Sequence, residues 1–424
     1  MNHKLIIRIK KRTQGELLIR LLFLLPFVLA PLCQLLHFPD AVKYAGDAAW
    51  MFLLLLLVLR RGGQSRNLQG ILLWVGLFAV YTALVYLLRY QSVFYYLWGI
   101  RNNFRFYVLF FATAAYLTRN DVEDLYRLLD KVFWINFAVT LVQYFLLDVE
   151  GDSLGGIFGT ESGCNGYTVI FHAIVVAKTV IFYLMGKKKT GPCLGVCVIA
   201  LYISALAELK YFFVIFIMIV VLGLLSTKFS WRQLLLIVGG TAAIFLGVTL
   251  LSALFSRGLN WFSLEWFYET ATSGKGYTSA GDINRLNAFS QINDRWLTDS
   301  WSRIFGLGLG NCDTAGFEIV NTPFFKTYGD MHYTWMSHAM MYLECGWIGL
   351  VFYFGFFLLV YFKVLKIEKT CSNEWKGYCR LARILAISCL TISIYNSSLR
   401  MESGYMAYFV LAVPFAAAKQ NTAQ

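Results

Sequence analysis

The stretch Met331–Leu350, MHYTWMSHAMMYLECGWIGL, joins a long polar segment to an apolar run near the end of the chain. Nine apolar stretches precede that polar segment. The junction carries His338, Glu344 and two glycines where the chain passes from polar to apolar surroundings. Ionisable side chains at such a depth are costly and are functional candidates by default.

The composition is that of an integral membrane protein. Of the 424 residues, 58% are hydrophobic and only 14% are charged, and the mean hydropathy is +0.59. A soluble domain would carry about 25% charged residues. The apolar stretch near residues 17–36 is too long for a signal-peptide core and has no clear cleavage site, so we expect a retained first span.

The net charge of +13 could indicate nucleic-acid binding, but cytoplasmic Lys and Arg that fix the topology explain it more simply. We therefore expect no nucleic-acid partner. The nine cysteines form no CxxC pair, which argues against a zinc or redox motif. We expect most of them to be small apolar packing residues.

Apolar runs recur along the chain, and a helix needs about 20 apolar residues to cross a bilayer. The sequence predicts an all-α polytopic membrane protein of about twelve transmembrane helices. We expect three parts: an N-terminal membrane bundle of about nine helices at 1–255, a large loop at 256–336 and about three membrane helices at 337–424. The predicted spans are residues 17–36, 45–59, 70–88, 104–118, 132–148, 165–185, 191–207, 210–226, 233–255, 346–365, 378–396 and 402–418.

The charges of the short loops predict the orientation. Loops on the side of the N-terminus are rich in Lys and Arg, whereas an opposite loop at 148–163 is acidic. Because such basic loops face the cytoplasm, both termini should be cytoplasmic and the large loop extracytoplasmic. The basic residues are Arg60, Arg61, Arg66, Arg119, Arg127, Lys131, Lys187, Lys188, Lys189, Lys228, Arg232, Lys363, Lys366, Lys369, Lys376 and Arg380.

Connections longer than about 15 residues are uncommon without a function, which makes the large loop a candidate for substrate contact. Its aromatic residues have two readings that the sequence leaves open. They could anchor the loop at the membrane interface, or they could stack on sugar rings. The tryptophans concerned are Trp261, Trp266, Trp296 and Trp301.

Five cations lie on the outer side in this topology, where the positive-inside rule does not explain them. Each alone could snorkel to the interface or form an ion pair, as Lys210 could with Glu208. Together they predict an anion site, because guanidinium groups match pyrophosphate oxygens in pairs. The five are Arg101, Arg105, Lys210, Arg285 and Arg400.

His338 is the main candidate for a general base, since imidazole titrates near neutrality. The alternative is a structural histidine. His332 is a candidate partner, but a spacing of six residues does not place both on one helical face, so we expect no metal site. GLGLGN at 306–311 matches a dinucleotide fingerprint only as a pattern, because no βαβ unit surrounds it. Gly308 and Gly310 instead predict a turn that lets the backbone approach a ligand or a helix.

GLGLGN, followed by His338, Glu344, Gly346 and Gly349 and then an apolar run, resembles the superfamily of bacterial O-antigen polymerases and O-antigen ligases. The layout of about twelve spans with one late external loop is also similar. The resemblance implies a metal-independent glycosyltransferase of GT-C type, without a cofactor, in the bacterial cytoplasmic membrane. It would act on undecaprenyl pyrophosphate-linked saccharides, with a flippase and a chain-length regulator as protein partners.

By the same resemblance, His338 would activate the acceptor hydroxyl, Arg285 would engage the donor pyrophosphate and Lys210 would assist it. Two departures weaken this match: Ala339 stands where members often have Asn, and Glu208 precedes Lys210. We expect a polysaccharide polymerase. The alternatives are a ligase that transfers finished chains to a lipid A core or another acceptor, a lipid-linked oligosaccharide flippase, and an assembly subunit without activity.

Overall fold

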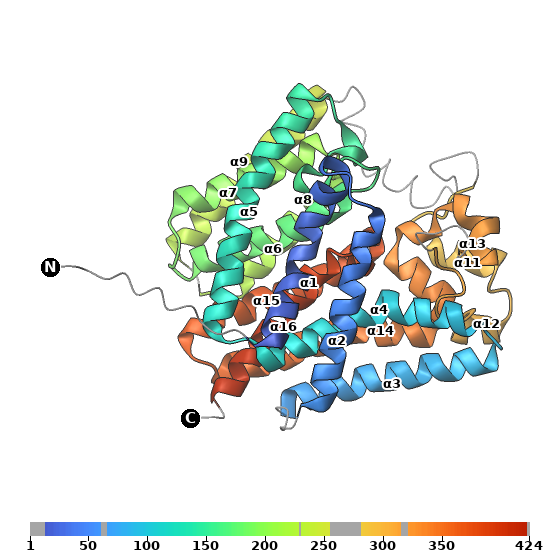
Figure 1. Cartoon of the computed structure of the whole chain (residues 1–424). Helices are drawn as coiled ribbons and strands as arrows, with labels where there is room; N and C mark the ends of the chain where they lie inside the picture. Colours follow the sequence, from blue (N-terminus) through green and yellow to red (C-terminus); the bar gives the residue numbers. More distant parts are fainter. Residues whose placement is uncertain (1–12, 61–65, 229, 255–280, 315–320, 422–424) are drawn as a thin grey trace.

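The computed structural model describes residues 13–60, 66–228, 230–254, 281–314 and 321–421, and it is all-helical over these ranges (Figure 1). Fifteen α-helices and no strand occur in this part of the chain. The prediction of an all-α fold is therefore confirmed for the described residues.

Nine helices precede the polar segment, and each overlaps one predicted span, but the predicted starts at residues 104 and 132 were wrong, since those helices begin 11 and 13 residues earlier. They are α1 (Gln14–Ala30, continued by a π-helical turn at Pro31–Leu35), α2 (Ala45–Leu59), α3 (Arg66–Leu88), α4 (Val93–Tyr116), α5 (Arg119–Leu146), α6 (Asn165–Leu184), α7 (Thr190–Leu206), α8 (Lys210–Leu225) and α9 (Trp231–Leu254).

Three short helices form the described part of the polar segment, and three long ones follow it. The short helices are α11 (Ala288–Arg295), α12 (Ser300–Phe305) and α13 (Pro323–Tyr328). The long helices are α14 (Ser337–Thr370), α15 (Asn373–Tyr395) and α16 (Gly404–Asn421).

Five of the described helices are long and apolar enough to cross a membrane, which supports a multi-pass membrane protein. Five further apolar helices are shorter, and the long helices α4 and α5 contain too many polar residues to qualify. The number of about twelve spans therefore stays a prediction. The five long apolar helices are Gln14–Leu35, Asn67–Leu88, Asn165–Leu184, Ser337–Thr370 and Asn373–Tyr395.

The predicted start of the tenth span at residue 346 was wrong as a helix boundary, because α14 begins nine residues earlier, at Ser337. Gly346 has a positive φ of 60° inside this helix and marks a kink. A Cβ there would overlap the Ile304 carbonyl group at the end of α12. His338 and Glu344 consequently lie in the helical segment before the kink, rather than at the end of a loop.

The described part of the polar segment has a small hydrophobic core of its own. Ile292, Leu297 and Tyr333 pack there against Met340 and Leu343 of α14. Figure 1 shows α11, α12 and α13 together on one side of the molecule. The first turns of α14 therefore fold with this segment and hold it against the helical bundle.

The loop tryptophans divide between this core and the surface. The Trp296 ring packs against Phe324, Tyr328 and Tyr333, with ring centroids 5.1 to 5.6 Å apart. Trp301 remains 51% exposed. Trp261 and Trp266 lie outside the described residues, so both interpretations of these two tryptophans stay predictions.

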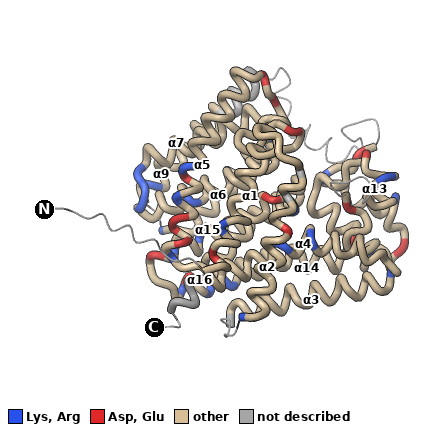
Figure 2. Tube along the Cα trace, in the orientation of Figure 1, with Lys and Arg blue, Asp and Glu red and all other residues tan. Residues whose placement is uncertain are grey.

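The helices alternate between two ends of one bundle. At one end Arg20 pairs with Asp121, and Arg119 pairs with Glu374, which brings together the starts of α1, α5 and α15. Figure 2 shows Lys and Arg gathered at this end, near the start of α1 and the end of α16. Arg285 contacts Tyr395, the last residue of α15, and Lys210 lies near Arg285, so both lie toward the opposite end.

Candidate functional site

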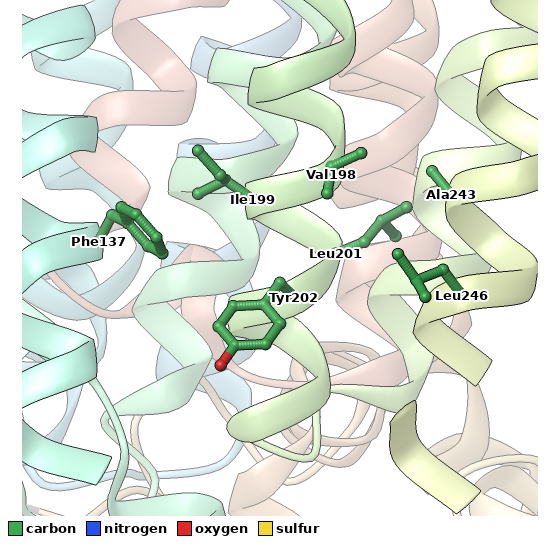
Figure 3. A pocket seen from close by; sticks show the side chains of 7 residues that line it. All are labelled: Phe137, Val198, Ile199, Leu201, Tyr202, Ala243 and Leu246. Carbon is green, nitrogen blue, oxygen red and sulfur yellow. The ribbon is translucent and has the colours of Figure 1, made fainter. Parts of the chain in front are cut away.

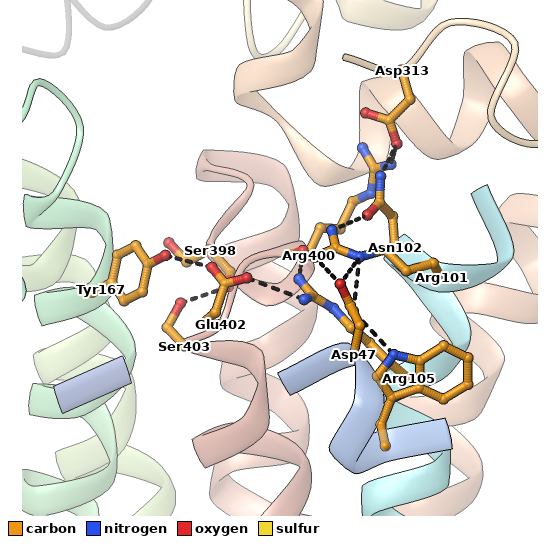
Figure 4. A network of polar contacts seen from close by, with 11 residues as sticks. Asp47, Arg101, Asn102, Arg105, Tyr167, Asp313, Ser398, Arg400, Glu402 and Ser403 are labelled. Carbon is orange, nitrogen blue, oxygen red and sulfur yellow. Dashed lines mark hydrogen bonds and ion pairs between the residues drawn. The ribbon is translucent and has the colours of Figure 1, made fainter. Parts of the chain in front are cut away.

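With the side chains that contact them, the predicted site residues form three groups, and Glu344, Gly308 and Gly310 lie apart from these at a junction between helices. The first, which we call the ion-pair network, consists of three arginines and three carboxylates from α2, α4 and the segments beside α14 and α16 (Figure 4). Its members are Asp47, Arg101, Arg105, Asp313, Arg400 and Glu402. The second, the Arg285 cluster, consists of Lys210, Tyr211, Arg285, His338 and Tyr395. The third is the pair Asp282 and His332.

Arg101 of α4 pairs with Asp47 in the first turn of α2. Arg101 Nε donates to both carboxylate oxygens of Asp47, at 2.9 and 3.1 Å, and a terminal nitrogen donates at 3.0 Å. The guanidinium also lies 4.8 Å from the centre of the Trp98 ring. The carboxylate and the ring therefore fix the orientation of Arg101.

Arg105, one turn further along α4, is almost completely buried. One terminal nitrogen donates to Glu402 Oε1 at 3.1 Å, and the other donates to the carbonyl oxygen of Arg400 at 3.1 Å. The Tyr167 hydroxyl donates to the second Glu402 oxygen at 2.8 Å. Burial alone would raise the pKa of Glu402, but Arg105 and Tyr167 outweigh burial and lower that pKa to about 2.

Arg400 completes the network from the segment between α15 and α16. Its terminal nitrogen donates to Asp313 Oδ2 at 2.7 Å, and the same oxygen accepts from the Asn102 amide at 2.8 Å. Burial opposes ionisation of Arg400, but the nearby carboxylates of Asp313 and Glu344 outweigh it and raise the pKa of Arg400.

In the ion-pair network three guanidinium charges thus face three carboxylate charges. Figure 4 shows these side chains converging from several helices. Arg105 and Arg400 each keep a buried Nε without a hydrogen-bond partner among the described residues. The positive charge of the arginines is nevertheless balanced within the protein, which suits a structural joint better than the capture of an anion.

The Arg285 cluster brings together two of the predicted cations. Arg285 Nε donates to the Tyr395 carbonyl oxygen at 2.7 Å, and the guanidinium lies 4.8 Å from the centre of the Tyr395 ring. That ring stacks on Tyr211 with centroids 4.3 Å apart and planes 10° apart. Lys210 precedes Tyr211 and lies close enough to Arg285 for their like charges to interact.

Both cations of this cluster reach the surface. Arg285 is half-buried, and the Lys210 side chain is 31% exposed. Glu208 lies beside Lys210, but the closest approach of its oxygen to Nζ is 3.9 Å. At that distance the pair is looser than those of the ion-pair network. Lys210 and Arg285 therefore bring two cationic side chains near each other at a partly exposed place.

His338 is 2% exposed and faces two carbonyl oxygens. Nδ1 lies 3.2 Å from the Ser393 oxygen, and Nε2 lies 3.0 Å from the Arg285 oxygen. The imidazole thereby ties the Arg285 segment to α15. In this arrangement neither ring nitrogen points to an open site, and the role of His338 as a base stays a prediction.

His332 is placed differently. Nδ1 lies 2.8 Å from Asp282 Oδ1, and the Asp282 side chain is fully buried. The His332 side chain is 27% exposed, and its Nε2 has no hydrogen-bond partner within the described ranges. The structure thus joins His332 to a carboxylate rather than to His338.

Glu344 and the glycine turn form a junction between helices. The backbone N–H of Cys312 donates to Glu344 Oε1 at 3.1 Å, and that of Gly308 donates to the Glu344 carbonyl oxygen at 2.8 Å. Gly308 and Gly310 have positive φ angles of 105° and 85°. A Cβ on Gly310 would overlap the Tyr95 carbonyl oxygen of α4. The turn therefore lies directly against α4, and contact of the same turn with a ligand stays a prediction.

We expect Gly310→Ala to lower the free energy of unfolding by at least about 1–3 kcal/mol, because it combines a disfavoured φ with overlap on α4. Gly76→Ala in α3 is the control, since nothing lies within 4 Å of a Cβ there and alanine favours a helix. Thermal unfolding in detergent measures both. Equal melting temperatures for Gly310→Ala and wild type would show that the turn accommodates the added Cβ without strain.

Sequence reasoning missed the carboxylates that neutralise the arginines and the tyrosines that support Arg285. Glu402 stands two residues after Arg400, a signal that a pairing argument could have used. Asp47 and Asp313 gave no local signal, because they are distant in sequence from their partners.

An apolar cavity of about 220 Å³ lies between α5, α7 and α9 (Figure 3). Its lining contains no charged side chain, so it offers nothing to the chemistry of an anion. The lining residues are Phe137, Val198, Ile199, Leu201, Tyr202, Ala243 and Leu246.

Metal chemistry has no candidate centre in the described part of the chain, where no group of three or more His, Cys, Asp or Glu side chains could hold an ion. No protein-family model matches the chain, and no curated protein matches it either.

Proposed function

We propose that this protein is a polysaccharide polymerase that joins undecaprenyl pyrophosphate-linked repeat units by metal-independent inverting glycosyl transfer. It would be a multi-pass protein of the bacterial cytoplasmic membrane with both termini cytoplasmic. The observation that supports this proposal best is the proximity of Lys210 and Arg285 at a partly exposed place, where α8 begins and α15 ends.

The reaction needs stabilisation of a leaving group more than it needs a strong nucleophile. An acceptor hydroxyl attacks the anomeric carbon of the donor, and the bond from that carbon to the pyrophosphate oxygen breaks. Arg285 can meet two phosphate oxygens with its planar fork, and Lys210 adds a compact charge. Cations placed where negative charge develops lower the barrier directly.

Two neighbouring functions remain alternatives. A ligase would use the same cations on the same leaving group but a different acceptor. A flippase would need a polar path through the middle of the membrane and no folded external segment. The hydrophobic core that α14 shares with the segment around α11 to α13 argues for a fixed external platform, and so for a transferase.

A strain lacking the gene tests the proposal when it is complemented with the wild-type chain. A polymerase should restore a ladder of polysaccharide lengths on a gel, whereas the deletion leaves a single lipid-linked repeat. Long chains left unattached to their acceptor would indicate the ligase. Repeat units trapped on the cytoplasmic face would indicate the flippase and would contradict a transferase.

A further inference from the structure

The pair Asp282 and His332 has the geometry of an oriented base. A buried carboxylate at 2.8 Å from Nδ1 holds the proton on that nitrogen. The lone pair of the neutral ring then lies on Nε2, which has no hydrogen-bond partner among the residues that the structure describes. A carboxylate behind a histidine both selects this tautomer and stabilises the imidazolium that forms when Nε2 takes a proton.

Two further features hold the ring in place. His332 has a left-handed backbone with φ 55° and ψ 23°, which is uncommon for a residue other than glycine. Its ring lies against Trp335, with centroids 3.8 Å apart and planes 31° apart. Strained conformations persist only where the surroundings determine them, and they cluster at functional sites.

The pair also lies near the cation that would bind the donor. Asp282 is three residues before Arg285, so their Cα atoms are at most about 11 Å apart. The backbone N–H of Ile283 donates to the Met331 carbonyl oxygen at 2.9 Å, which joins the segment of Asp282 to the segment of His332.

We propose that His332, oriented by Asp282, is the base that takes the proton from the acceptor hydroxyl. This inference rests on the proposed transferase function. The hydroxyl proton passes to His332 Nε2 as the oxygen bonds to the anomeric carbon. The pyrophosphate leaves with the electron pair of the broken bond, and its new charge faces Arg285 and Lys210. His332 later releases its proton to water.

His338 is less suited to this step in the observed arrangement. Its two nitrogens face carbonyl oxygens of Ser393 and Arg285 at 3.2 and 3.0 Å. Whichever nitrogen keeps the lone pair of the neutral ring, that nitrogen faces a backbone carbonyl oxygen rather than an open site. In this arrangement His338 ties the Arg285 segment to α15 and so helps to position it.

The variant His332→Gly removes the imidazole and keeps the backbone conformation, because glycine adopts a positive φ readily. With full-length enzyme in detergent and the lipid-linked repeat extracted from the deletion strain, we expect its rate to fall about 10²–10⁴-fold. Added imidazole should restore part of that rate. The matched control is His37→Gly, since His37 is exposed and has a φ of 54°. Its rate should equal that of wild type, with no response to imidazole.

Asp282→Asn tests the orienting role, because it keeps the size of the side chain and removes its charge. We expect the rate to fall at least about 10-fold. The melting temperature of Asp282→Asn should be close to that of His332→Gly. Full activity of His332→Gly, or a loss that imidazole leaves unchanged, would overturn the assignment of the base. Failure of the proposed function is distinguishable, since the wild-type enzyme would then extend no chain in the same assay.

Discussion

Replacing Arg285 by alanine should lower the rate of polymerisation by about 10²–10³-fold, the usual cost of removing one group that stabilises charge in a transition state. Arg285 is held by the Tyr395 carbonyl oxygen and ring, so little reorganisation is needed when the leaving group arrives. Lys210→Ala should cost less, since a single ammonium cannot meet two oxygens at once.

Lys326→Ala is the matched control, because Lys326 is an exposed cation on α13 in the same folded segment. Its rate should equal that of wild type. Arg285→Lys should recover only part of the rate, since it restores the charge without the planar fork. The assay is chain extension by full-length enzyme on the extracted lipid-linked repeat.

Arg257→Ala should also cost far less than Arg285→Ala, although Arg257 lies outside the described residues. Equal losses for Arg285→Ala and Lys326→Ala would show that the segment responds to net charge alone. The assignment of Arg285 to the leaving group would then fail.

Helix positions followed from the apolar runs because each run satisfies a local requirement for length and hydrophobicity. The run from Ala45 to Leu59 became α2 with the predicted bounds, and α6 and α8 each ended within one residue of theirs. The start of α14 could not be found in this way. Its first turns are buried against the segment of α11 to α13, so their helix depends on contacts that are remote in sequence.

The candidate site was predictable in its residue types but not in its pairings. Arg105 and its partner Glu402 are 297 residues apart, and Arg101 and Asp47 are 54 apart. An arginine in an ion pair and an arginine in an anion site look alike in one sequence. Only the three-dimensional arrangement shows that Arg101, Arg105 and Arg400 are each paired with a carboxylate.

Glu402→Gln should lower the free energy of unfolding by about 3–5 kcal/mol, because it leaves the buried Arg105 charge without a counter-charge. Removing both partners in Arg105→Met with Glu402→Leu should cost less than either single change, since no isolated charge then remains buried. Glu161→Gln, at an exposed carboxylate, is the control and should melt as wild type does. Thermal unfolding in detergent compares these variants.

The pH dependence of that loss identifies its electrostatic origin. The pKa of Glu402 in the folded chain is about 2, below the ordinary value of 4.5. A carboxyl group with a lowered pKa contributes its full stability above the ordinary value and loses it as the pH falls toward the lowered one. The gap in melting temperature between wild type and Glu402→Gln should therefore be constant above about pH 5 and close toward pH 2. A gap that does not change with pH would mean that the side-chain amide disturbs packing, and that Arg105 has its counter-charge elsewhere.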